Sequence, residues 1–473
     1  MGKRRKHINK HKGEYFSNLI RGIDLERLLI VSIDAAKYHQ KALICNYFGD
    51  IIQDSFFFST DLKGFNTLLD KMRASIENVN AVKVLVGIEA TGHYYEDTVS
   101  LLQKDGFEVI IINPLTTHEE RSASLNWCKT DDIDLSAIAY CVIHNKGTDS
   151  KLTSGIYAEL QTLTRCRKSL VNHRSSIKIQ IRTIMDSIWK EFQGYPEISD
   201  DKPSVIKVFS DLWGKAPRFF MRHYPLPHQI LYLGYEGLKQ LSKENNLKLR
   251  KETIKKLLHA ASISNKKDES TLSSELMLLS LYLEQLDLYD KQIEELEHKI
   301  EGLAVETEAV LLLTCPKIAT TTAAAFIAEI GPIDHYIHAG QLIKKGGTNA
   351  MVFQSGGGRG FYTKISKQGN KNLRAVIFTI GKNLSHGNPY FEDFYKRLKS
   401  KGKHTHAAYI AVGNKFLKVA FSMLKKGRPF MPPLWEGQSL TVTTSSSIKC
   451  VKHAEKAQET LQTILLSQGQ KVS

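Results

Sequence analysis

The first 140 residues alternate short apolar runs with stretches in which apolar side chains recur every three or four positions. An unbroken or alternating apolar run predicts a strand, and the longer period predicts a helix. Five runs predict strands, at residues 28–34, 41–48, 51–59, 82–90 and 107–113. Four stretches predict helices, at residues 61–77, 93–104, 116–124 and from Thr130 onward.

The order of these elements predicts an α/β domain. Gly49-Asp50 lies between the second and third strands and is typical of a hairpin turn. The run VKVLVGIEA at 82–90 is apolar at every position between Lys83 and Glu89, which favours a central strand buried on both faces. Three strands followed by alternating helices and strands indicate the ribonuclease H topology, a mixed sheet with helices on both faces.

The remainder of the chain has a helical pattern, so the expected fold class is α/β plus all-α. A long basic helix is predicted over 155–195. Residues 279, 286, 293 and 300 are apolar and each is followed three residues later by Tyr or Leu, which predicts a coiled coil with an unidentified partner. We expect five parts: a basic arm (1–27), a catalytic domain (28–150), a helical insert with the coiled coil (151–306), a small mostly helical domain (307–430) and a flexible tail (431–473).

Charge indicates the kind of partner. The chain has 65 Lys and Arg against 49 Asp and Glu, a formal net charge of +16, which favours a polyanion. No apolar run reaches the roughly 18 residues of a transmembrane helix, and MGKRRKHINKHKG lacks the apolar core of a signal peptide. We expect a cytoplasmic protein that binds nucleic acid and no membrane. Six scattered cysteines without a CxxC pair argue against a zinc site and a disulfide framework.

Four carboxylates are the candidate catalytic groups. Asp34 ends the first strand and Glu89 the central one, whereas Asp131 and Asp134 share one face at a helix start. The topology would bring them together, and two Mg²⁺ ions would relieve their repulsion and act on a phosphodiester. Each residue alone is weak evidence, because such aspartates are commonly turn or cap residues. Asp132 leaves a different choice of ligand open.

Several segments resemble the DEDD-type transposases of bacterial insertion sequences, recombinases guided by a bridge RNA. VSIDAAK, VGIEATGHYYE and NWCKTDDIDLSAIA resemble the first signature of that family, and QSGGGRGFYTKISKQGNKNLR resembles the second. The similarity spans roughly residues 28–425 in the family's order of RuvC-like domain, coiled-coil insert and transposase domain. The sequence departs from the family pattern at two places. Residues 316–319 are Pro-Lys-Ile-Ala where the family has Pro-Gly-Ile-Gly, and Leu135 stands where the family has Ala.

The resemblance implies a serine nucleophile. The matching position is Ser355, which precedes three glycines that would allow close approach to a phosphate. The family chemistry is attack on DNA with a covalent phosphoserine intermediate, and the carboxylate–Mg²⁺ site would activate the hydroxyl. Basic residues of the long helix and of the segment after Ser355 are candidate nucleic-acid contacts, although a solvated basic face is also common: Arg165, Arg167, Lys168, Arg174, Lys178, Arg182, Arg359, Lys364, Lys367, Lys371 and Arg374.

Three functions compete at this point. The first is a DNA transposase that recombines donor and target DNA with a guide RNA, as a dimer through the coiled coil and a tetramer in synapsis. The second is a Mg²⁺-dependent, structure-selective nuclease of the junction-resolvase kind, which uses the carboxylates without a serine. The third is a catalytically silent nucleic-acid-binding protein, which needs only the charge.

Overall fold

The computed structural model describes residues 19–123, 130–149, 155–199, 202–265, 269–353, 361–431 and 448–467. The chain forms two compact units, Met1–Leu152 and Thr153–Ser473. Within the described ranges, no helix is both long and apolar enough to cross a bilayer.

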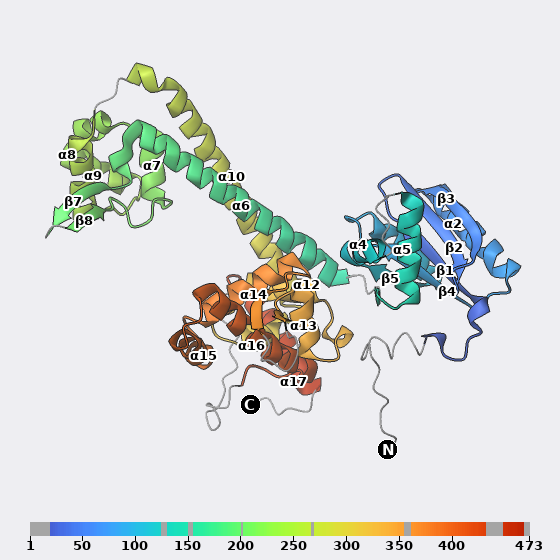
Figure 1. Ribbon diagram of the computed structural model, residues 1–473. Helices are drawn as coiled ribbons and strands as arrows, with labels where there is room; N and C mark the ends of the chain where they lie inside the picture. The colour runs from blue at the N-terminus through green and yellow to red at the C-terminus, as the bar shows by residue number, and fades with distance from the viewer. Residues whose placement is uncertain are drawn as a thin grey trace. The chain divides into compact units, whose positions relative to one another are not determined.

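The first unit is built on a six-stranded sheet in the order β3-β2-β1-β4-β5-β6 (Figure 1). Strand β2 is antiparallel to β1 and to β3, whereas β4 is parallel to β1 and to β5. This is the strand order of the ribonuclease H topology, so the predicted α/β class is confirmed. The strands are β1 (Leu28–Asp34), β2 (His39–Asn46), β3 (Ile51–Ser59), β4 (Lys83–Glu89), β5 (Glu108–Ile112) and β6 (Thr148–Asp149).

Helices cover both faces of this sheet, which explains the unbroken apolar runs. Val31 and Ile33 of β1 pack on the face covered by α2 and α3, whereas Leu28 and Ile30 pack on the face covered by α5. A strand buried on both sides needs apolar residues at every position and not at alternate ones. The helices are α2 (Leu62–Asn78), α3 (Tyr95–Lys104), α4 (Pro114–Ala123) and α5 (Asp131–Ile143).

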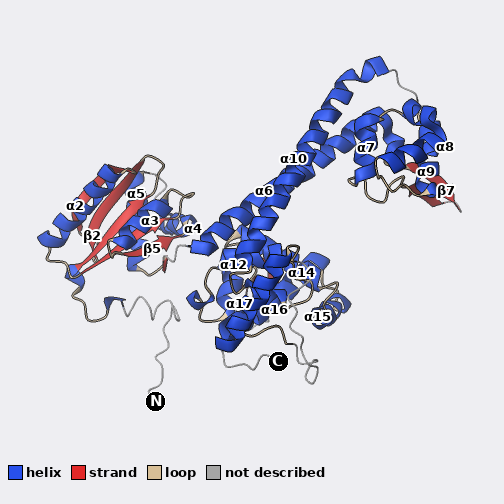
Figure 2. Ribbon diagram, turned by 180° about the vertical axis from the view of Figure 1, so that it is seen from behind, coloured by secondary structure: helices blue, strands red, loops and turns tan. Residues whose placement is uncertain are grey.

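Two long helices, α6 (Gly155–Trp189) and α10 (Ser273–Ala304), lie side by side in the second unit (Figures 1 and 2). The pair is antiparallel, because residues near the start of α6 pack with the end of α10. The four apolar residues spaced by seven on α10 are each at most 4% exposed, so the predicted seam is buried. Its partner is α6 of the same chain.

Separate hydrophobic cores lie at the two ends of this helix pair. One gathers the end of α6 and the start of α10 with α7 (Lys215–His223), α8 (Pro227–Glu244), α9 (Lys251–Ile263) and the hairpin of β7 (Tyr195–Ser199) and β8 (Lys202–Ile206). The other gathers the opposite ends with α11 (Ala309–Leu313), α12 (Thr320–Ile330), α13 (Ala339–Gly346), α14 (Lys371–Leu384), α15 (Pro389–Ser400), α16 (Thr405–Lys426) and α17 (Val451–Ser467). Strands β9 (Ala350–Phe353) and β10 (Phe361–Ile365) pair with each other between α13 and α14.

The predicted basic arm and the predicted flexible tail both contain packed residues. Ala457, Leu461 and Leu465 of α17 are buried in the second core, so residues 451–467 are a packed helix rather than a flexible tail. At the other end, Leu19 and Ile23 of the predicted arm pack against the sheet face that α5 covers. Both segments are amphipathic, and only a neighbouring apolar surface gives such a segment a fixed place.

Helices α14 and α16 cross at two glycines, which fixes how closely they approach. A Cβ built on Gly381 would lie 2.0 Å from the backbone oxygen of Tyr409, and one on Gly413 would lie 2.6 Å from that of Ile377. Backbone atoms cannot rotate out of the way, so a side chain at either glycine requires the helices to separate.

Gly381→Ala is therefore expected to lower the free energy of unfolding by about 1–3 kcal/mol. Gly237→Ala in α8 is the control, because its added carbon would meet only the side chain of Leu233, 3.3 Å away on the preceding turn. Chemical denaturation monitored by circular dichroism measures both. Equal stability of the two variants would contradict the close crossing.

Candidate active site

The parallel pairing of β1 with β4 sets two carboxylates side by side. Ile33 lies opposite Ile88 in this pairing, so the next residues, Asp34 and Glu89, end neighbouring strands at the same edge of the sheet. Both are partly buried. The arrangement expected for these two residues from the topology is present.

Helix α5 begins at the same edge. Lys41 of β2 lies opposite Asp34, and its Nζ is 2.7 Å from Oδ1 of Asp132 on the first turn of α5. The hydroxyl of Thr130 accepts from the backbone N–H of Ile133, so the helix cap is Thr130 and not Asp131. The first turn of α5, with its three aspartates, therefore lies next to the strand ends.

Helix α4 joins Glu89 to Asp134. Thr117 donates from its hydroxyl to Oε2 of Glu89, and Arg121 binds Oδ1 of Asp134 through Nη1. The two α4 residues are one helical turn apart and so lie on one face. Thr91, just after β4, donates to Oε1 of Glu89 at 2.9 Å. The carboxylates of Glu89 and Asp134 are thus both held by the same face of α4.

Asp132 is the least suited of the aspartates to bind a metal. The Lys41 ammonium and the Ser55 hydroxyl, both bonded to its carboxylate, hold the pKa of Asp132 below its usual value. Its side chain is 61% exposed and pairs with Lys41. Asp134 is only 14% exposed, whereas Asp131, three residues earlier on the same helix face, is exposed.

The donor set suits a hard divalent cation, because carboxylate oxygens are the ligands that Mg²⁺ prefers. Among the residues described, however, no three of the four carboxylates bring their oxygens close enough together to hold one ion. Arg121 and Lys41 place positive charge beside Asp134 and Asp132 in this arrangement. Neither of these two cations nor Thr117 is predicted from the sequence, because nothing in their local pattern distinguishes them from surface residues.

Ser355 and Arg359 lie outside the described residues, but the ends of their loop are held together. Strands β9 and β10 pair antiparallel, with Phe353 opposite Phe361 on either side of residues 354–360. Residues 354–360, which include both positions, connect these two paired strands in the sequence.

The hairpin between α11 and α12 keeps its turn without the family's glycines. Lys317 has a φ of 74°, the left-handed region that glycine occupies without strain. Its side chain lies over Gly387, where an added Cβ would come within 2.4 Å of the Lys317 Cε.

Most of the basic residues predicted on α6 make contacts within the chain. Arg165 binds the carboxylate of Glu329, which is 3% exposed, through two hydrogen bonds of 2.8 and 2.9 Å. Arg167 pairs with Glu297, Arg174 with Asp290, and Lys168 with Asn372, while Lys178 and Arg182 lie over the ring of Trp213. Burial lowers the pKa of Lys178. These side chains hold α6 to its neighbours, whatever else they bind.

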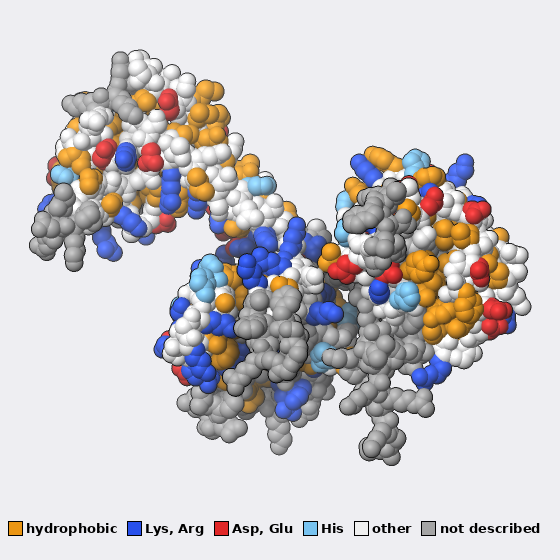
Figure 3. Space-filling view, in the orientation of Figure 1, with side chains coloured by type: hydrophobic (Ala, Val, Ile, Leu, Met, Phe, Trp, Pro, Cys, Tyr) orange, Lys and Arg blue, Asp and Glu red, His pale blue; other side chains and the backbone are white. Residues whose placement is uncertain are grey.

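The lysines after the serine loop are more exposed. Lys364, Lys367 and Lys371 are exposed, whereas Arg374 donates to the backbone oxygens of Gly346 and Lys367. Lys and Arg side chains gather over α6 and α14 on the face seen in Figure 3. This face of the second unit is a candidate surface for a nucleic-acid backbone.

Two family models match the chain, both described as transposases. The first is the DEDD type named for IS110 and matches residues 31–190; the second is the IS116/IS110/IS902 family and matches residues 309–396. The chain belongs to the IS110-type DEDD transposases. The first match spans the edge that carries Asp34, Glu89, Asp131 and Asp134, and the second spans the serine hairpin.

Two curated relatives match one segment of this transposase. They are the pilin gene-inverting proteins of Moraxella bovis and Moraxella lacunata, each 31% identical over 123 residues. The matched segment is 26% of this chain and 38% of each relative, so the chain matches well under half of their length.

Removal of the Thr117 hydroxyl tests the hydrogen bond from α4 to Glu89. Thr117 is 1% exposed, and Thr117→Val would leave a partly buried carboxylate with one donor fewer, so stability should fall by about 1–2 kcal/mol. Thr116→Val, one residue earlier and less buried, should be nearly neutral. Thermal or urea unfolding compares the two. A neutral effect of Thr117→Val would exclude this hydrogen bond as a stabilising contact.

Proposed function

We propose that this transposase cuts and rejoins DNA strands at the ends of an insertion sequence and at its target, guided by a bridge RNA. The observation that carries the proposal is the juxtaposition of Asp34 and Glu89 at neighbouring strand ends, with α4 linking Glu89 to Asp134. Family membership and the net charge of +16 agree with a DNA substrate and an RNA guide.

The proposed nucleophile is Ser355. Its hydroxyl loses a proton and its oxygen bonds to phosphorus, while one bridging P–O bond of the DNA breaks and the released sugar oxygen takes up a proton. A sugar hydroxyl of the second DNA then attacks the phosphoserine, which restores the serine and joins the new strand. The energy of the broken phosphodiester bond is kept in the serine ester, so rejoining needs no cofactor as an energy source.

Asp34, Glu89, Asp131 and Asp134 are the proposed ligands of two Mg²⁺ ions. Bound Mg²⁺ supplies charge stabilisation of the attacking and leaving oxygens. Oδ1 of Asp134 binds the Arg121 guanidinium, so this oxygen can serve as a metal ligand only after that contact breaks. Arg121 would then be available for a phosphate oxygen.

Recombination joins two DNA sites, so we propose a dimer that pairs into a tetramer in synapsis. The buried seam of α10 is occupied by α6 of the same chain. A dimer contact through this helix would use its other apolar stripe, in which Leu278, Leu281 and Leu288 are 42%, 42% and 52% exposed.

The rival function is a nuclease that uses the same carboxylates with water as the nucleophile. The two mechanisms differ in one product, since only the serine mechanism leaves protein covalently bound to a DNA end. A silent nucleic-acid-binding protein would have neither Mg²⁺-dependent cleavage nor the covalent product.

Substitution of the catalytic groups is expected to separate these functions. Ser355→Ala should lower strand exchange at least about 10³-fold and abolish the covalent product, because the nucleophile is lost. Asp34→Asn and Glu89→Gln should have effects of similar size. Ser400→Ala, at the exposed end of α15, should exchange strands like the wild type.

The assay is denaturing electrophoresis of labelled DNA after incubation with protein and Mg²⁺. Cleavage by Ser355→Ala at the wild-type rate would establish the rival nuclease mechanism. Full activity of Asp34→Asn and Glu89→Gln would exclude the carboxylate site itself.

The guide is tested by the nucleic acid that the protein carries. RNA that copurifies with the full chain should be one discrete non-coding species, with segments complementary to donor and target DNA. Sequencing of the bound RNA measures this. DNA exchange by protein stripped of all RNA would exclude guidance and leave the rest of the mechanism intact.

A further inference from the structure

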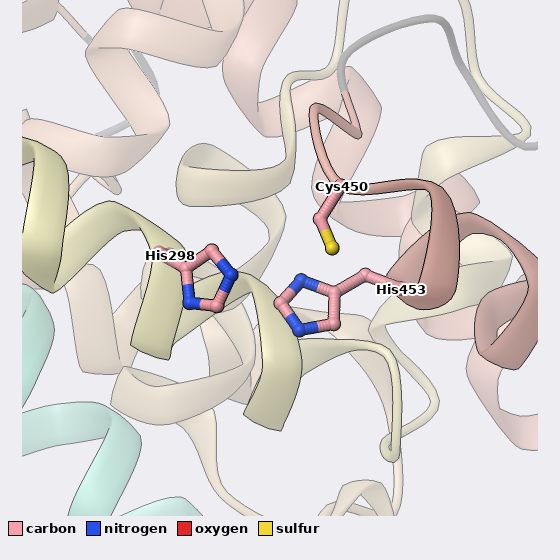
Figure 4. Close-up of side chains that lie close together, drawn as sticks. All are labelled: His298, Cys450 and His453. Carbon is pink, nitrogen blue, oxygen red and sulfur yellow. The ribbon is translucent and has the colours of Figure 1, made fainter.

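Two imidazoles and a thiol come together in the second unit, outside the elements that carry the proposed chemistry. His298 lies on α10, Cys450 directly precedes α17, and His453 lies in the first turn of α17. A nitrogen of each ring and the sulfur of Cys450 are all within 4.8 Å of one another. The three side chains point toward one another from the two elements (Figure 4).

The chemistry of these donors selects the ion. Zinc binds histidine nitrogen at about 2.0–2.1 Å and thiolate sulfur at about 2.3 Å, so ligand atoms around a tetrahedral ion lie roughly 3.4–3.6 Å apart. The ligand atoms, within 4.8 Å of one another, would have to close to these separations around a bound ion. Imidazole and thiolate suit Zn²⁺, whereas Mg²⁺ requires oxygen ligands. This group is therefore distinct in its metal preference from the carboxylates of the first unit.

A buried carboxylate holds the ligands in position. Glu301 is 5% exposed, and its Oε1 lies 3.0 Å from Nδ1 of His453 and accepts from the backbone N–H of Cys450, also at 3.0 Å. Its Oε2 accepts from the N–H of Lys449. One side chain of α10 thus fixes both the ring of His453 and the backbone of Cys450. A carboxylate behind a ligating histidine is a common support in zinc sites.

Gly302 allows the ring to lie against α10. A Cβ built on this glycine would meet Nε2 of His453 at 3.1 Å, which is closer than ordinary contact. Residues 301 and 302 therefore both shape the place where His453 sits.

We propose that His298, Cys450 and His453 bind one structural Zn²⁺ that fastens α17 to α10, with Glu301 as a positioning residue. On binding, the thiol of Cys450 releases its proton to solvent and the thiolate forms the Zn–S bond. The fourth position is open to water. The ion joins segments about 150 residues apart and reinforces the burial of Ala457, Leu461 and Leu465 on the second core.

The sequence did not predict these ligands, because no two cysteines form the CxxC pair that is typical of zinc sites. Two of the ligands form a Cys-x-x-His step, and the third comes from a helix far earlier in the chain. Only the packing of α17 on α10 brings the three together.

The test is the zinc content of the purified full-length protein after incubation with zinc in excess Mg²⁺ and removal of free metal. The wild type should retain about one zinc per chain. Cys166→Ser is the matched control, since Cys166 is an exposed thiol on α6, and it should retain the same amount. Cys450→Ser and His453→Ala should lose at least about nine-tenths of the zinc, and Glu301→Gln should bind it about 10–100-fold more weakly.

A second measurement uses the wild-type protein and so tests the proposal even where a variant fails to fold. Wild-type protein loaded with Co²⁺ should have a sulfur-to-cobalt charge-transfer band and the visible bands of a tetrahedral ion. Chelation should also lower the melting temperature of the wild type and of Cys166→Ser.

The proposal is overturned by wild-type protein that retains no zinc above the chelated blank. It is equally overturned by equal zinc in Cys450→Ser and Cys166→Ser, or by a cobalt spectrum without the sulfur band. In each of these cases the His453–Glu301 contact is a hydrogen bond without a metal.

Discussion

The parallel register between β1 and β4 is the constraint on which the first unit depends. Two strands that begin far apart in the sequence end beside each other, so their last residues, Asp34 and Glu89, meet without either strand bending. Both strands are buried on both faces, and a slip of one residue would turn every side chain to the opposite face. The register that satisfies the core is thus the one that assembles the carboxylates.

Like charges at that edge need partners, and the fold supplies them from three elements. Lys41 comes from β2, Thr117 and Arg121 from α4, and Thr91 from the turn after β4. None of these contacts requires a metal, which gives the edge a stable arrangement of its own. A ligand role for Oδ1 of Asp134 then requires exchange of the Arg121 guanidinium for a metal ion, which is a change in partner and not in fold.

In the second unit, a buried ionic network ties the long helix to the small helical domain. Glu329 of α12 accepts from Arg165 of α6 and from Asn370, which also caps α14. Loss of one partner from such a buried set leaves an uncompensated charge, so the network specifies one relative placement of α6, α12 and α14. Charges that look like a nucleic-acid surface along the sequence of α6 are therefore partly structural.

The sequence by itself determined the succession of strands β1 to β5 along the chain, the long helix and the apolar heptad positions, because each depends on local periodicity. The catalytic role of the four carboxylates stays a prediction, since it rests on motifs of adjacent residues and on the family resemblance. The sequence also predicted that Asp131 and Asp134 share a helix face, since that follows from helical spacing alone. Tertiary structure decided which surface each amphipathic segment covers: the seam of α10 packs on α6, and α17 packs on the second core. It also decided the partners of charged groups, such as Arg121 with Asp134 and Glu301 with His453, which join elements far apart in the chain. Periodicity reports that a face is apolar or charged, but the identity of its partner is a property of the packed chain.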